Sequence, residues 1–245
     1  MKIVLPDSKT VTKGDLDLSG LKKYGEVITY DLTPEELLPD RVADADVIIC
    51  NKTPLNAGTL RKAEHLQYIG LFATGFNNID TDYTDKKKIT VCNAGSYSTH
   101  AVAQHTFALL LNWASKIQEY DSYVKEGGWI GSDTFSPFSF PMNELEGKTI
   151  GIIGLGSIGI EVASLAKAFH MRVLAYNRSA KTVEGVQLVT LAELLARSDV
   201  ITMHCPLNRD SEKMCNREFF TACKDGAYFI NTARGGLVEE EALVE

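Results

Sequence analysis

The sequence TIGIIGLGSIG, residues 149–159, decides the fold of the second half of this chain. Its first five residues form a short apolar run that is typical of a buried β-strand. Gly154, Gly156 and Gly159 follow in the spacing G-x-G-x-x-G, and a helical run begins at Ile158. A strand, these glycines and a helix in this order form the fingerprint of a dinucleotide-binding βαβ unit. The alternative is an ordinary tight turn that holds three glycines.

Each glycine of this loop has its own expected role. Gly154 permits the tight turn, Gly156 lets the backbone approach a pyrophosphate, and Gly159 lets the helix pack close to the strand. The amino end of the helix offers free N–H groups and the positive end of a dipole. We therefore expect the phosphates of a dinucleotide to bind here.

Strand-like and helical runs alternate on both sides of this loop, which predicts βαβ units and parallel sheets. The first unit ends near Gly95 and the second begins at Lys148. Thr33 is a plausible cap for the first helix. The expected strands are residues 2–5, 27–30, 47–50, 68–72, 90–92, 149–153, 172–176, 186–189, 200–204 and 227–230. The expected helices are residues 34–42, 100–125, 158–169, 191–197 and 217–223.

The helical run 100–125 contains FALLLNWA, residues 107–114, which is apolar almost all round. A helix that is apolar on every side is buried, so this helix is expected at a domain connection or a subunit contact. The loop after it carries four aromatic residues, which favour either an interface or packing onto the protein's own surface. These aromatic residues are Trp129, Phe135, Phe138 and Phe140.

The end of the second strand of this unit bears on the choice of dinucleotide. An acid at that position binds the ribose hydroxyls of NAD. Here the position holds the uncharged Asn177, and Arg178 follows it. Because an arginine beside a neutral residue can pair with a 2′-phosphate, NAD or NADP is expected with a preference for NADP. In the alternative, Arg178 points into solvent and Asn177 still binds the ribose of NAD.

Composition excludes several classes of function. The chain of 245 residues has a net charge of −7, which argues against a nucleic-acid or anionic-membrane partner. No apolar run is long enough to span a bilayer or to form a signal peptide. The five cysteines form no CxxC pair, and the five histidines show no metal-ligand spacing. We expect a reduced, cytoplasmic protein without a metal site.

Two further segments are candidate site loops because they follow expected strands. They are His204-Cys205-Pro206-Leu207 and Asn231-Thr232-Ala233-Arg234. Cofactor contacts in this type of fold come from the carboxyl ends of the strands. His204, Cys205 and Pro206 are therefore expected to contact the cofactor. Cys205 as a buried thiol and Thr232 as an ordinary loop residue are the alternatives.

Five stretches together resemble the D-isomer-specific 2-hydroxyacid dehydrogenase family, and most closely its glycerate dehydrogenase (hydroxypyruvate reductase) group. They are ATGFNNID (73–80), VAQHT (102–106), ELEGKT (144–149) leading into the glycine loop, HCPL (204–207) and NTARGG (231–236). The resemblance implies an α/β fold of two Rossmann-like or flavodoxin-like domains with parallel sheets, the second a doubly wound dinucleotide-binding domain. The implied substrate domain is 1–98, a connecting helix at the dimer contact is 99–126, and the dinucleotide-binding domain is 127–245.

The resemblance also implies an activity: interconversion of a small 2-keto acid, such as hydroxypyruvate or glyoxylate, and the D-2-hydroxy acid by a homodimer. Arg234 matches the catalytic arginine that binds the substrate carboxylate and keto oxygen, and it suits this role because its planar fork stays charged. The backbone of Ala73, Thr74 and Gly75 matches the rest of the carboxylate site. The matching cofactor contacts are Thr74, Ser157, Ile158, Cys205, Thr232 and Ala233, beside the glycines and Arg234 itself.

The sequence departs from the family in one respect. The family's proton-donating histidine and its glutamate lie after the arginine, in segments that we expect to fall beyond Glu245. Reduction by this chain is therefore expected to be impaired, because a general acid contributes typically about 10²–10⁴-fold to the rate. The alternative is a dinucleotide-binding module, resembling the family's corepressors, that works without catalysis.

Overall fold

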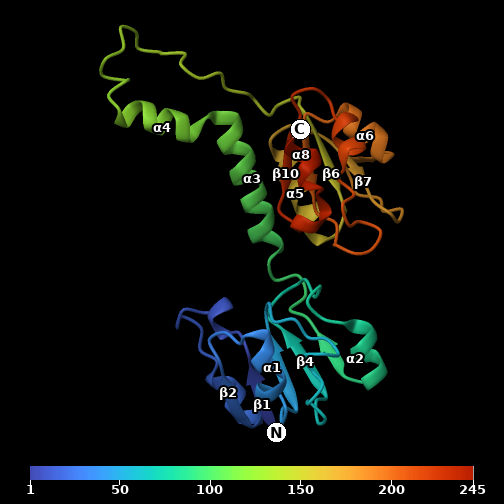
Figure 1. The fold of residues 1–245 in the computed structure, drawn as a ribbon. Coiled ribbons are helices and arrows are strands. Elements are labelled where there is room, and N and C mark those ends of the chain that lie inside the picture. The colour runs from blue at the N-terminus through green and yellow to red at the C-terminus, as the bar shows by residue number, and fades with distance from the viewer. Residues whose placement is uncertain (245) are drawn as a thin grey trace. The chain divides into compact units, whose positions relative to one another are not determined.

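A computed structural model describes residues 1–244. The chain divides into two compact units, Met1–Tyr97 and Ser98–Glu245 (Figure 1). Within the described residues each unit contains one sheet of five strands, and all strand pairs are parallel. The α/β class and the parallel sheets expected from the alternating pattern are thereby confirmed.

The sheet of the first unit has the order β2-β1-β3-β4-β5, which is the flavodoxin-like order. Its core consists of short aliphatic runs, such as Val47–Cys50, that are buried on both faces by the flanking segments. Its strands are β1 (Lys2–Leu5), β2 (Glu26–Thr29), β3 (Val47–Cys50), β4 (Tyr68–Leu71) and β5 (Thr90–Cys92). Its helices are α1 (Leu38–Arg41) and α2 (Thr81–Lys87), with 3-10 turns at Ser8–Thr10, Ser19–Tyr24 and Glu35–Leu37.

Hydrogen bonds of Asp7 and Thr33 fix parts of the backbone in the first unit. The buried carboxylate of Asp7 accepts hydrogen bonds from the backbone N–H groups of Asn51, Lys52 and Thr53, so the end of β1 holds the loop after β3. The expected cap at Thr33 is wrong, because Pro34 precedes the 3-10 turn and makes no side-chain cap. The Thr33 hydroxyl accepts instead from the guanidinium of Arg41, at 2.9 Å.

The sheet of the second unit has the order β10-β9-β6-β7-β8. Numbered within this unit, the order is 5-4-1-2-3, which is the doubly wound dinucleotide-binding arrangement read from its other edge. Ile150 in the central strand pairs with Val173 on one side and Val200 on the other. The strands are β6 (Thr149–Ile153), β7 (Arg172–Tyr176), β8 (Val186–Leu188), β9 (Val200–Met203) and β10 (Tyr228–Asn231). The helices after β6 are α5 (Ser157–Ala168), α6 (Leu191–Arg197), α7 (Arg217–Thr221) and α8 (Glu240–Val244), with a 3-10 turn at Gly235–Leu237.

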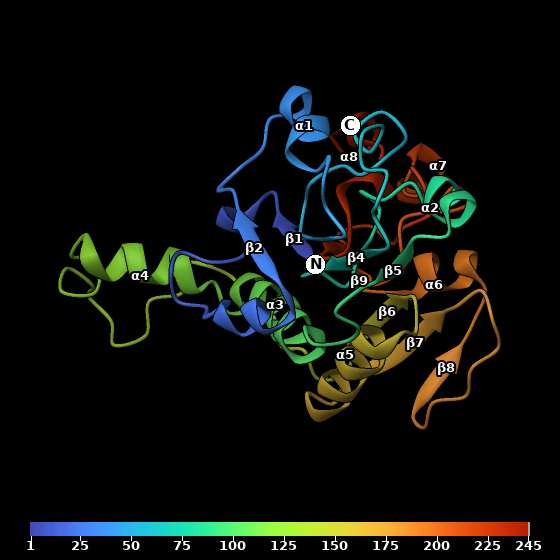
Figure 2. The same ribbon diagram turned by 90° about the horizontal axis from the view of Figure 1, so that it is seen from below.

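The expected single helix at 100–125 is two helices, α3 (Thr99–Ser115) and α4 (Ile117–Lys125). Lys116 separates them in a left-handed conformation with φ 53°. The expectation that α3 is buried on every side is wrong in part, because Leu109 is 37% exposed. Its other face packs along α5, and Trp113 stacks on Tyr228 of β10. These contacts explain why α3 belongs to the second compact unit (Figure 2).

The loop after α4 extends away from the sheet of its own unit in both ribbon views (Figures 1 and 2). Phe135 is 88% exposed and Phe138 is 95% exposed. Phe140 packs instead against Tyr120 and Tyr123 of α4, as expected for packing onto the protein's own surface. Among residues 1–244 no helix has the length and apolar character needed to cross a membrane.

Candidate functional site

The strand order of the second unit changes direction between β6 and β9. β6 lies between β7 and β9 in the sheet, so connections from β6 and β9 leave in opposite directions. In open α/β sheets the crevice outside the carboxyl ends of the strands at such a switch point is the ligand site. The glycine loop follows β6, and residues 204–207 follow β9. The two sequence-predicted loops therefore meet at the switch point.

The three glycines of the loop differ in what surrounds them. Gly154 has φ +100°, and a Cβ there would lie 2.7 Å from the backbone nitrogen of Cys205. A Cβ on Gly159 would lie 2.0 Å from the carbonyl oxygen of Gly154, so the helix packs tightly onto the loop. A Cβ on Gly156 would meet no atom within 4 Å. Space for a ligand thus exists at Gly156, while Gly154 and Gly159 are fixed by packing.

The amino end of α5 is open for an anion. Gly156 is the N-cap residue of this 12-residue helix and makes no side-chain cap, and the first turn holds no acidic residue. The N–H groups at Ser157 and Ile158 belong to the first turn, where helices bind phosphate through unsatisfied donors and the dipole. Both residues therefore lie where a pyrophosphate is expected.

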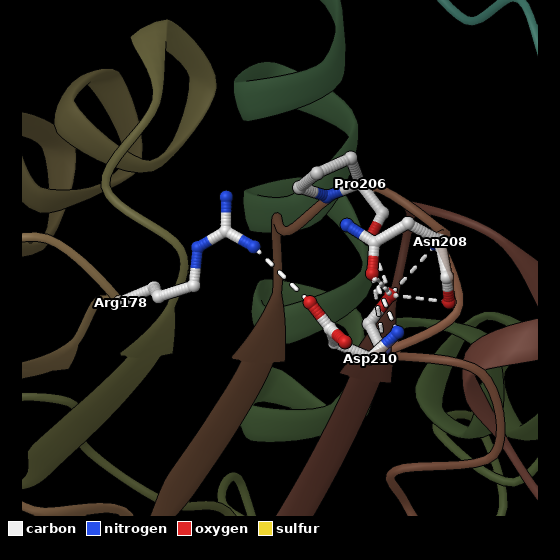
Figure 3. Close-up of polar contacts among 5 residues, drawn as sticks. Arg178, Pro206, Asn208 and Asp210 are labelled. Atoms are coloured by element: carbon white, nitrogen blue, oxygen red, sulfur yellow. Dashed lines mark hydrogen bonds and ion pairs between the residues drawn. The ribbon is translucent and has the colours of Figure 1, made fainter.

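The segment after β7 is fastened to the glycine loop. Asn177 accepts a hydrogen bond through Oδ1 from the Leu155 N–H at 3.0 Å and donates through Nδ2 to the carbonyl of Ser179 at 2.8 Å. Lys181 donates from Nζ to the Leu155 carbonyl at 2.9 Å. Arg178 forms an exposed ion pair with Asp210, with 3.2 Å between Nη1 and Oδ2 (Figure 3). Two cations therefore stand at the edge where a ribose 2′-substituent is expected.

Sequence reasoning did not identify Lys181 or Asp210 as members of this site. Lys181 lies four positions after Asn177, and a second cation in that segment was a usable signal. Asp210 lies 32 positions after Arg178, and only the sheet order brings the two together. No local pattern in the sequence indicates that pair.

His204 stands beside the glycine loop in an unusual electrostatic state. Its Nε2 atom lies 3.0 Å from the hydroxyl of Thr202, and its buried Nδ1 atom has no hydrogen-bond partner within residues 1–244. Burial lowers the pKa of His204 to about 4, because desolvation disfavours the imidazolium. The side chain is therefore neutral near pH 7 and donates no imidazolium proton.

The neighbours of His204 pack rather than react. Burial raises the pKa of the Cys205 thiol, and its Sγ lies 3.8 Å from the sulfur of Met214. Cys205 therefore behaves as a small apolar residue that stays protonated. Pro206 is exposed, and its carbonyl accepts from the hydroxyl of Ser211 at 2.7 Å.

Arg234 follows β10 on a backbone that is held locally. Asn231 donates to the Arg234 carbonyl at 2.8 Å and accepts from the Ala233 N–H at 3.0 Å. Thr232 is joined to Thr106 of α3, with 3.1 Å between the hydroxyl oxygens. The Arg234 side chain is exposed and donates to the Ala233 carbonyl, and no carboxylate among the described residues pairs with it. Its guanidinium thus retains most of its donors for an anionic ligand.

In the first unit, the loop after β4 is joined to the loop after β5. The Thr74 hydroxyl donates to the Gly95 carbonyl at 2.6 Å, and Asn93 donates to the Thr74 carbonyl at 2.7 Å. The Ala94 N–H donates to the carbonyl oxygen of the buried Ala73 at 3.0 Å. The predicted substrate-binding residues Ala73, Thr74 and Gly75 are therefore held at the carboxyl edge of their own sheet.

Two other features do not compete with this site. The described part of the chain contains no group of three or more histidine, cysteine or acidic side chains placed to hold a metal ion. A cavity of about 640 Å³ in the second unit is lined by Thr149, Arg172 and Val186, at the amino ends of their strands. Because ligands in this fold bind at the carboxyl ends of the strands, that cavity lies at the edge of the sheet where a dinucleotide is not expected.

The family model and the relatives that match this chain all point to one protein family. The family model of the D-isomer specific 2-hydroxyacid dehydrogenase NAD-binding domain matches residues 107–245. A hydroxypyruvate reductase of Blautia hydrogenotrophica is 39% identical over 100% of this chain and 78% of its own length. A glycerate dehydrogenase of Methylorubrum extorquens is 38% identical over 87% of this chain and 66% of its own length.

Solved structures resemble the whole chain. An acyclic imino acid reductase in complex with NADPH and D-arginine has a TM-score of 0.89 and 33% identity, covering 99% of this chain and 78% of that one. A D-lactate dehydrogenase of Aquifex aeolicus complexed with NAD and lactic acid has a TM-score of 0.85 and 32% identity, covering 99% and 72%.

Substitutions in the glycine loop should separate binding from folding. Gly156→Ala should fold like the wild type, because its methyl group enters open space, and should weaken dinucleotide binding by about tenfold or more, since the methyl occupies the approach to the phosphates. Gly159→Ala should lower the melting temperature, because its methyl meets the Gly154 carbonyl. Thermal melts and titration of nicotinamide fluorescence check both. Wild-type binding by Gly156→Ala would contradict the assignment.

The buried state of His204 predicts a pH dependence of stability. Its pKa is about 4 in the folded chain and 6.5 as the ordinary value, so between these values the unfolded state binds the extra proton. The free energy of unfolding should therefore fall as the pH drops from 6.5 towards 4, by no more than about 3 kcal/mol from this residue.

His204→Gln should flatten this dependence, whereas the exposed His105→Gln should keep it. Denaturant unfolding at pH 5 and pH 7, followed by the fluorescence of Trp113 and Trp129 in the second unit, measures the difference. An unchanged pH dependence in His204→Gln would rule out this residue as the cause.

Proposed function

Because the chain belongs to the D-isomer specific 2-hydroxyacid dehydrogenase family, we propose that it interconverts a small 2-keto acid and the D-2-hydroxy acid with a nicotinamide dinucleotide. Hydroxypyruvate and glyoxylate are the proposed keto acids. Support comes from relatives that are a hydroxypyruvate reductase, a glycerate dehydrogenase and a glyoxylate reductase. Family membership makes the chain an oxidoreductase with an NAD-binding domain.

The open space at Gly156 beside the uncapped end of α5 carries this proposal. It is the feature of the second unit that fits a pyrophosphate and that an ordinary tight turn does not require. Around it we propose cofactor contacts from Gly154, Gly159 and the loops after β7, β9 and β10. The remaining proposed contacts are Thr74, Ser157, Ile158, Asn177, Arg178, His204, Cys205, Pro206, Thr232, Ala233 and Arg234.

Arg234 is proposed to bind the substrate carboxylate and keto oxygen. The exposed guanidinium has five donors in a planar fork, which matches two oxygen atoms better than an ammonium does. A reduced nicotinamide bound at the glycine loop would supply the hydride for the keto carbon. Arg234 would stabilise the negative charge that develops on the keto oxygen until a proton arrives. Ala73, Thr74 and Gly75 are proposed as further carboxylate-binding residues of the first unit.

We propose that His204 is not the group that donates the proton to the alkoxide. His204 is neutral near pH 7 because burial lowers its pKa to about 4. The other four histidines are exposed, at positions 65, 100, 105 and 170. Loss of a positioned acid typically reduces a rate by about 10²–10⁴-fold. The same observation supports the second candidate function, a dinucleotide-binding module without catalysis.

A preference for NADP over NAD is proposed from the segment after β7. Asn177 is uncharged, and Arg178 and Lys181 place two cations there, which favour a 2′-phosphate. The structural relative that is an acyclic imino acid reductase holds NADPH, which supports the same preference.

Self-association is proposed for the face formed by α4 and the loop after it. This face exposes seven large apolar residues, and clustered exposed apolar groups favour an interface. They are Ile117, Val124, Trp129, Ile130, Phe135, Phe138 and Met142.

Sedimentation velocity should show a dimer that Phe138→Ser weakens. A monomeric wild type would contradict this proposal.

Oxidation of NADH and of NADPH with hydroxypyruvate tests the proposed reaction. We expect slow turnover, faster with NADPH, and loss of about tenfold or more in kcat/KM in Arg234→Lys, because the ammonium cannot bind two oxygens at once. Arg172→Lys at the amino end of β7 serves as the matched control and should leave kcat/KM unchanged. An unaltered kcat/KM in Arg234→Lys would exclude the proposed role, and binding without turnover would favour the non-catalytic candidate.

A further inference from the structure

We propose that Asp210 sets the choice between NADH and NADPH by holding Arg178 in an ion pair that a ribose 2′-phosphate must break. This inference rests on the proposed function, because it requires a dinucleotide at the glycine loop. Asp210 thereby acts as a specificity-determining residue for a cofactor whose phosphate it does not itself bind.

The ion pair spans the central strand of the sheet. Arg178 belongs to the segment after β7 and Asp210 to the loop after β9, and β6 lies between these two strands. The pair joins Nη1 of Arg178 and Oδ2 of Asp210 at 3.2 Å (Figure 3). It therefore bridges the two sides of the switch point, above the strand that leads into the glycine loop.

The Asp210 side of the pair is held by a built turn. Asn208 accepts through Oδ1 from the backbone N–H groups of Asp210 and Ser211, at 2.9 Å and 3.2 Å. The Ser211 hydroxyl accepts from the Asn208 N–H at 2.9 Å and donates to the Pro206 carbonyl at 2.7 Å (Figure 3). This turn fixes the backbone of Asp210. The longer and more flexible Arg178 side chain is the partner that moves when the pair breaks.

The Arg178 side of the pair is positioned by the glycine loop. Its neighbours Asn177 and Lys181 are hydrogen-bonded to the N–H and the carbonyl of Leu155, which lies inside that loop. A dinucleotide whose pyrophosphate lies at Gly156 places its adenosine ribose towards the end of the second strand of the unit, which is β7. The 2′-position of that ribose is therefore expected within reach of the Arg178 guanidinium.

The charges give the direction of the effect. Asp210 occupies Nη1 of Arg178 in the unliganded chain, so a 2′-phosphate gains this donor only after the pair opens. The Arg178 side chain is 83% exposed and the Asp210 side chain is 79% exposed. Ion pairs this exposed to water contribute little free energy, so a bound phosphate can separate them. NADH carries no 2′-phosphate and makes no demand on Arg178. Removal of the Asp210 charge should thus strengthen the binding of NADPH alone.

Dissociation constants for NADH and NADPH test this inference in the full chain. Asp210→Asn should bind NADPH about threefold to fivefold more tightly than the wild type, which is the range that an exposed pair allows. NADH affinity should change less than about twofold by the same reasoning. Asp225→Asn is the matched control, because this exposed acid lies in the turn before β10, at the opposite edge of the sheet, and should change neither constant. Titration of nicotinamide fluorescence supplies all the constants.

The variant Arg178→Ala separates occupancy of Arg178 from any other effect of Asp210. In that background Asp210→Asn should leave the NADPH constant unchanged, because the donor that Asp210 occupies is gone. A gain that persists without Arg178, or equal changes for NADH and NADPH, would overturn the inference while leaving the proposed function intact. Failure of the wild type to bind either dinucleotide would instead overturn the proposed function and this inference together.

Discussion

The close approach of two loops at Gly154 is the constraint on which the second unit depends. The turn after β6 has φ +100° at Gly154 and passes against the backbone of His204 and Cys205 at the end of β9. Any side chain there would push the two loops apart and strain the turn. With no side chain, the glycine loop turns directly into α5, so the amino end of that helix follows the carboxyl end of β6, next to β9 in the sheet. The fold and the candidate site thus share one steric requirement.

Hydrogen bonds and close backbone contacts hold the other loops at the carboxyl ends of these strands, while the charged side chains of the loops stay exposed. The loops after β9 and β10 are joined by the bridge between Cys215 and Val238, and a Cβ on Gly236 would lie 2.9 Å from the Leu207 side chain. Asn208 and Asn231 each hold a short turn through their amide oxygen, and the amide oxygen of Asn177 accepts from the Leu155 N–H of the glycine loop. The guanidinium groups of Arg178 and Arg234 remain exposed on these fixed turns. Rigid backbone with exposed charge is the arrangement that binding of an anionic ligand requires.

The sequence predicts the strands of both sheets well, because a short aliphatic run between turn residues is typical of a buried strand. It also predicts the glycine loop, because each of the three glycines has a steric role: the tight turn, the approach of a ligand, and the packing of the helix on the strand. It fails where packing overrides pattern: Lys116 breaks the expected long helix in a left-handed turn, and one face of α3 faces outward at Leu109. Pairs such as Arg178 with Asp210 depend on sheet order, which no local sequence pattern specifies.

Hydrogen exchange of the chain with and without a dinucleotide locates the cofactor site. When NADPH is added, exchange should slow at 153–160 and 204–212, around the switch point. Exchange should not change at 185–197, where residues line the cavity at the amino ends of the strands. Protection confined to 185–197, or none in either segment at saturating NADPH, would contradict a cofactor site at the glycine loop.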